Sequence, residues 1–159
     1  MAFTKAARVI AIFLVMILSL LRFSRGADTW PQWRGPNRDG FISGPSWPDS
    51  LAEDRLKLLW RVDLGAGYAG PIVASDRVFV AETKDQKSEV VRALDRQSGQ
   101  ELWTASWPGA MKVPFMARHN GDWIRSTPAY DGESLYVAGM RDVLVCLNAQ
   151  SVYVHTDCH

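Results

Sequence analysis

Residues 70–82 and 127–139 repeat one pattern, and this repeat limits the possible folds more than any other feature of the chain. In GPIVASDRVFVAE and TPAYDGESLYVAG, a Pro precedes a short apolar run, a polar turn and a second apolar run. The strand that follows also recurs, because VVRALD at 90–95 aligns with VLVCLN at 143–148. A period of roughly 40–50 residues indicates stacked units that bury their apolar faces on one another.

The runs between the turns have the composition of β-strands. They are rich in Val, Ile and Phe, and no stretch after residue 27 has a convincing helical period. A polar hairpin loop is expected at 83–88, and PGAMKVPFMARHNGD at 108–122 is an insertion before the second unit. We therefore predict an all-β fold of four-stranded antiparallel blades, with strands in the first unit at 56–64, 71–74, 77–82 and 89–94.

ALDRQSGQELW, residues 93–103, predicts a tight turn that leads to a large side chain. The Asp95 carboxylate can accept backbone N–H bonds within the turn, and the Ser98 hydroxyl can add a weaker bond. Gly99 supplies a position of positive φ at little cost. We expect Trp103 to lie in the seam between neighbouring blades, and Trp60 opens the preceding unit in the same way.

Two stretches of the chain resemble PQQ-like propeller proteins. Ala93, Asp95, Ser98, Gly99 and Trp103 resemble the family repeat A-x-D-x-x-T-G-x-x-x-W, with Ser in place of the usual Thr. WPQWRGPNRDG at 30–40 resembles the start of exported PQQ-like propellers of planctomycete-type bacteria. The family includes quinoprotein dehydrogenases and outer-membrane assembly lipoproteins, and the resemblance implies a propeller of seven or eight blades.

The chain departs from that family pattern in length and at its end. Residues 56–148 provide about two blades, and the expected S/T-G-x-x-x-W is missing after Asn148. The segment 149–159 therefore reads as an aberrant or truncated tail. We expect an incomplete propeller, an N-terminal fragment of a longer protein. The alternative is a short chain that completes itself by assembly or has a different fold.

The first residues predict an export signal. Lys5 and Arg8 precede VIAIFLVMILSLL at 9–21, a run too short for a typical membrane span. We interpret residues 1–26 as a signal peptide and 27–55 as an extended segment. No Cys follows the apolar run, so no lipid anchor is expected. The predicted location is the periplasm or cell envelope, and membrane contact would come only through an uncleaved signal.

Charge narrows the possible partners. The net charge is +1 and charged residues are spread along the chain, which argues against a nucleic-acid surface. Protein or cell-envelope polymer partners remain possible.

The resemblance also implies PQQ and Ca²⁺ as possible cofactors, but no residue can be assigned to them. The sequence has no vicinal Cys pair and no readable calcium-ligand spacing. We therefore predict no catalytic residue and no metal ligand, and cofactor-binding residues stay unknown. HTDCH at 155–159 is interpreted as part of the tail, with metal binding as the alternative. His119 is interpreted as a surface-loop residue, with a contribution to a site at the top of a blade as the alternative. Cys146 is expected to be a buried thiol, with a Cys146–Cys158 disulfide as the alternative.

Two functions of different classes follow. The first is a non-catalytic exported scaffold or binding module of the PQQ-like repeat family. The second is a fragment of a PQQ-dependent quinoprotein that oxidises an alcohol or a sugar. A truncated product with no folded function is a third possibility. Fold does not decide among them, because one architecture carries many functions.

Overall fold

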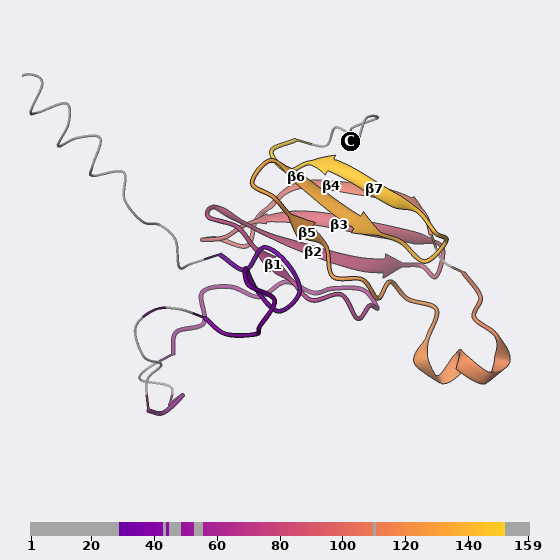
Figure 1. Ribbon diagram of the computed structural model, residues 1–159, viewed down its shortest axis with the longest axis horizontal. Helices are drawn as coiled ribbons and strands as arrows, with labels where there is room; N and C mark the ends of the chain where they lie inside the picture. The colour runs from indigo at the N-terminus through magenta and orange to yellow at the C-terminus, as the bar shows by residue number, and fades with distance from the viewer. Residues whose placement is uncertain (1–28, 43, 45–48, 53–55, 110, 152–159) are drawn as a thin grey trace, which may run out of the picture.

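The computed structural model describes residues 29–42, 44, 49–52, 56–109 and 111–151. Two antiparallel sheets make up the regular structure (Figure 1). The described residues contain no α-helix, and their one helical element is the 3₁₀ turn η1 (Phe115–Asn120). The predicted all-β class and its incomplete set of propeller blades are thus confirmed. The predicted signal peptide and most of the tail lie outside the described residues.

The first sheet has four strands in chain order, as expected for one blade. Apolar residues follow one another in its long strands, as at residues 78–81, and successive side chains point to opposite faces, so both faces of the sheet are apolar. The hairpin between the second and third strands is tighter than predicted, because pairing continues to Lys84 opposite Ser88. The strands are β1 (Ile72–Val73), β2 (Arg77–Lys84), β3 (Ser88–Asp95) and β4 (Glu101–Pro108).

The second sheet repeats the first but has three strands among the described residues. Its strands are β5 (Ala129–Tyr130), β6 (Ser134–Ala138) and β7 (Leu144–Asn148), again in chain order. The second sheet is thus an incomplete blade within the described residues. The residues that follow Ser151 lie outside them.

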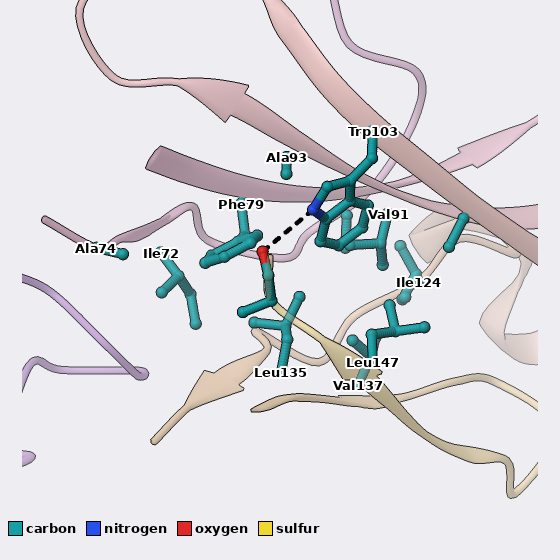
Figure 2. Close-up of a cluster of buried hydrophobic side chains, with 13 residues drawn as sticks. Ile72, Ala74, Phe79, Val91, Ala93, Trp103, Ile124, Leu135, Val137 and Leu147 are labelled. Carbon is teal, nitrogen blue, oxygen red and sulfur yellow. Dashed lines mark hydrogen bonds between the residues drawn. The ribbon is translucent and has the colours of Figure 1, made fainter. Parts of the chain in front are cut away.

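The main core lies between the two sheets. Figure 1 shows the second sheet lying across one face of the first. Phe79, Val91 and Trp103 from the first sheet pack with Leu135 and Leu147 from the second (Figure 2). Burial of apolar surface is worth about 25 cal/mol per Å². The buried side chains of this seam therefore stabilise the contact between the blades.

Residues 56–64 do not form the predicted strand. They carry no strand pairing, and the nearest ladder contact is the single bridge between Ala66 and Thr83. A strand needs a neighbour to accept and donate its backbone hydrogen bonds. The described residues offer no free neighbour at this position, which explains the difference.

The start of the described chain is a compact turn. Arg34 Nη2 donates to the backbone oxygen of Asp39 at 3.1 Å, and the Asp39 carboxylate accepts from the Phe41 N–H at 2.9 Å. Trp30 then bridges to Val73 and so joins this turn to β1. WPQWRGPNRDG thus has a structural role here.

Candidate functional site

The turn after β3 is held by one carboxylate oxygen. Asp95 Oδ1 accepts hydrogen bonds from the Gln97 N–H at 3.0 Å and from the Ser98 N–H at 2.8 Å. It also accepts from the Ser98 hydroxyl at 2.7 Å. These bonds favour the charged form and lower the pKa of Asp95, the Ser98 hydroxyl having the largest effect. Asp95 and Ser98 therefore form one hydrogen-bonded turn.

Trp60 docks onto this turn from the chain segment before the first sheet. Its Nε1 donates to the backbone oxygen of Arg96 at 2.9 Å. Its ring lies flat against Gly99, where an added Cβ would come within 2.6 Å of the indole. Gly99 also has a φ of 72°. Glycine is required here both by the backbone conformation and by the approach of the ring.

A second turn of the same construction lies after β7. We call each of these turns, together with the indole that binds it, a joint. Asn148 Oδ1 accepts from the Gln150 N–H at 2.9 Å, the Ser151 N–H at 3.1 Å and the Ser151 hydroxyl at 3.3 Å. Trp103 Nε1 donates to the backbone oxygen of Ala149 at 3.1 Å, the dashed line in Figure 2. Each indole thus binds the carbonyl that follows the Asp or Asn of the next turn.

This second turn was not predicted from the sequence. The motif was expected to end at Asn148, yet Ser151 stands three residues later, as Ser98 does after Asp95. The motif departs at Val152, which replaces the glycine of the first turn, and at Thr156, which replaces the tryptophan; both lie outside the described residues. The signal was the N-x-x-S spacing, which was hidden because Asn replaces Asp.

Arg77 fastens the second joint from the first sheet. Its Nη1 donates to the Ala149 oxygen and its Nη2 to Gln150 Oε1, both at 2.6 Å. Its Nη2 also pairs with the Asp76 carboxylate at 2.7 Å. The guanidinium lowers the pKa of Asp76 through this hydrogen bond. One buried cation therefore holds the turn of the next blade against the first.

The comparison with known families agrees with this geometry. Residues 86–154, which hold Trp103 and both turns, match the family model described as outer membrane protein assembly factor BamB. This part of the chain is a PQQ-like repeat. Among curated proteins, none matches this sequence. In the described part of the chain, no helix has the length and apolar character to cross a bilayer.

A buried carboxylate, which the sequence analysis did not single out, links the blades at the opposite strand ends. Glu89 is fully buried, and its Oε2 accepts from Trp107 Nε1 at 2.7 Å. Its Oε1 accepts from the Met140 N–H, also at 2.7 Å. Gly109 and Gly139 leave room for it, since a Cβ at either would collide with the carboxylate. Nothing in the local sequence pattern distinguishes Glu89 from an exposed strand residue.

A cleft of about 500 Å³ opens between the β2–β3 hairpin and the insertion. Three basic side chains line it, and no acidic partner of any of them is found among the described residues. Its one carboxylate, Asp122, accepts the Val113 N–H at 3.0 Å. An adjoining hollow of about 360 Å³ adds the ring of Trp123. The lining of the cleft is Gln86, Lys87, Met111, Lys112, Asp122 and Arg141.

The remaining candidate residues do not join a site. His119 lies exposed on η1, and Cys146 is a buried free thiol. Cys158 and HTDCH lie outside the described residues. Within the described ranges, no three His, Cys, Asp or Glu side chains come together as metal ligands would. The cleft itself offers one carboxylate, and Ca²⁺ prefers six to eight oxygens, so these residues do not fit a PQQ–Ca²⁺ centre.

Proposed function

We propose that this PQQ-like repeat protein is an exported, non-catalytic binding module of the cell envelope. The observation that carries the proposal is the cleft, where Lys87, Lys112 and Arg141 surround a hollow with a single carboxylate. A concave surface with converging cations fits an acidic segment of a partner protein. The match to an outer-membrane assembly factor supports a place in the envelope.

The test is a titration of the full chain with a Glu-rich peptide, followed by the fluorescence of tryptophan, since Trp123 borders the cleft. We expect saturable binding that weakens by about tenfold or more between low and physiological salt, because exposed charges are screened. Lys112→Glu should weaken binding at least tenfold. Lys57→Glu makes the same charge change near Trp60, at the other end of the first sheet, and should have little effect. Equal loss in both variants would refute the cleft.

The alternative, a fragment of a PQQ-dependent alcohol or sugar dehydrogenase, is tested separately. PQQ and Ca²⁺ are added to the full chain, and quinone absorbance and dye reduction are followed. We expect neither a spectral shift nor reduction of the dye at high micromolar PQQ. Dye reduction that depends on both additives and on an alcohol would overturn the non-catalytic assignment.

A further inference from the structure

The cleft and the adjoining hollow have a wall in common. Gln86, Lys112 and Asp122 line both of them. The two spaces, of about 500 and 360 Å³, are therefore neighbouring parts of one depression, which we call the groove. Pockets of this size hold drug-sized ligands, and a few consecutive residues of a peptide are of similar size. The groove is thus large enough to contact more than one side chain of a bound segment.

The charge of the groove changes from one part to the other. Lys87 and Arg141 line the cleft alone, whereas the common wall carries Lys112 and Asp122, whose formal charges cancel. The residues that line the hollow alone are uncharged. A carboxylate is therefore attracted toward the cleft, since the hollow has no cation of its own.

The hollow is lined by apolar groups where the cleft does not reach it. Val113, Gly121 and Trp123 line the hollow alone. Gly121 lies against the Trp123 ring, where an added Cβ would come within 2.7 Å of the indole. Tyr68 packs on the same ring, with 5.6 Å between the ring centroids and 40° between the ring planes. The indole is therefore held in place, and a fixed indole that borders a hollow suits a second aromatic ring.

Gln86 lies in the common wall at a backbone position that favours glycine. Its φ is 53°, as is that of Asp85, and both residues stand in the turn between β2 and β3. A positive φ costs free energy for a residue with a Cβ, and glycine avoids this cost. The Gln86 side chain is exposed and borders both parts of the groove. A primary amide both donates and accepts hydrogen bonds, so it fits the main chain of a peptide that crosses this wall.

We propose that the groove binds a protein segment in which an aromatic residue stands beside acidic ones. This inference rests on the proposed function, the binding of an acidic segment in the cleft, and adds the residue that decides which acidic segments bind. The acidic side chains lie at Lys87 and Arg141, and the aromatic ring enters the hollow beside Trp123. Gln86 hydrogen-bonds to the main chain between them. A segment with acidic residues alone fills only the cleft, so the hollow supplies the specificity.

The test compares three dye-labelled peptides on the full chain by fluorescence anisotropy at low salt. The first has a Phe beside a run of Glu, the second has Ser in place of the Phe, and the third has Gln in place of every Glu. Each is made in both orders, with the Phe before or after the run, and the tighter order is used. We expect the first peptide to bind at least about tenfold more tightly than the other two, because burial of a Phe side chain and pairing of the carboxylates both add to its affinity.

Variants of the chain locate the aromatic contact. Trp123→Ala should abolish the advantage of Phe over Ser and keep the preference for Glu over Gln. Trp33→Ala removes an exposed indole that does not line the groove and should leave all three affinities unchanged. Gln86→Gly should weaken binding of the first peptide by about three- to tenfold, the effect of one hydrogen bond, and should leave the urea midpoint nearly unchanged. Circular dichroism shows whether each variant has kept its fold.

The outcomes separate this inference from the proposed function. Equal binding of the Phe and Ser peptides, or an advantage of Phe that persists in folded Trp123→Ala, would overturn the inference and leave the binding of acidic segments in place. Unchanged affinity in Gln86→Gly would overturn a segment that crosses from the cleft to the hollow. Absence of saturable binding for every Glu-containing peptide would refute the proposed function and the inference together. If Trp123→Ala does not fold, the peptide series on the unsubstituted chain decides.

Discussion

At the scale of single residues, the protein is defined by two indoles that each bind one backbone carbonyl of the next turn. Trp60 binds the Arg96 oxygen and Trp103 the Ala149 oxygen, at 2.9 and 3.1 Å. An indole combines a large apolar surface with one N–H donor. It can therefore fill the seam and fix the turn beyond it.

Replacement of Trp103 should separate these two contributions. We expect Trp103→Ala to lower the free energy of unfolding by about 3–5 kcal/mol, as other large truncations in cores do. Trp103→Phe should cost about 1–2 kcal/mol, because Ala149 keeps its bond from Arg77. Urea unfolding followed by circular dichroism measures both. Trp33→Phe is the control, since Trp33 is 66% exposed and its loss should change stability by less than about 0.5 kcal/mol.

Gly99→Ala tests the approach of the Trp60 ring. Both Gly99 and Gly132 have positive φ, 72° and 113°, but only at Gly99 would a Cβ meet a neighbour. Gly132→Ala therefore reports backbone strain alone, about 1–2 kcal/mol. We expect Gly99→Ala to cost at least 1 kcal/mol more in the same urea experiment. Equal losses would show that the ring does not press on this turn.

Asp95 should make stability depend on acid pH. Its pKa is lowered from 3.8 by the Ser98 hydroxyl and by backbone N–H groups. A carboxylate whose pKa falls on folding stabilises the protein above its unfolded pKa, and this is lost as the pH falls through the folded pKa. Asp95→Asn should keep the turn, as Asn148 does, and should flatten the fall in urea midpoint below about pH 4. An unchanged pH profile would contradict this role.

At the scale of elements, the strands were predictable and the partners of the strands were not. Val-rich runs between turn residues located β2, β3, β6 and β7 within a few residues, because apolar alternation and turn chemistry act locally. The segment 56–64 has the same local pattern but no neighbour within the described chain, so it failed as a strand. Pairing depends on segments distant in sequence, which local pattern does not report.

The joints show the same division between local and distant information. Asp95, Ser98, Gly99 and Trp103 were predictable because the turn uses residues close together in the sequence. The role of Arg77 was not, because its partners Ala149 and Gln150 lie more than seventy positions away. The cleft was also missed, since it gathers residues from two hairpins and the insertion.

Replacement of Glu89 tests a contact between elements. The Glu89 side chain joins β3 to Trp107 on β4 and to Met140 in the β6–β7 turn. Glu89→Ala should cost about 2–4 kcal/mol, because it leaves two part-buried donors without their acceptor. Glu89→Gln keeps one acceptor oxygen and should cost less. Amide exchange should locate the loss at residues 139–143, and a loss spread evenly over both sheets would contradict a local clamp.

At the scale of the whole molecule, the described residues form two propeller-type blades held by repeated tryptophan joints. Each joint leaves a face that needs another unit, because repeat proteins gain stability from their neighbours. The cleft and the unpaired segment 56–64 are two consequences of this stacking at different ends of the sheets.

The most direct test of the joints is hydrogen exchange of the indole N–H groups, resolved by NMR and assigned by single Trp→Phe variants. The account predicts that the Trp103 and Trp60 protons exchange only through opening of the blades, many times more slowly than that of the exposed Trp33. Exchange of the Trp103 proton as fast as that of Trp33 would contradict the central claim that this indole locks one blade to the next.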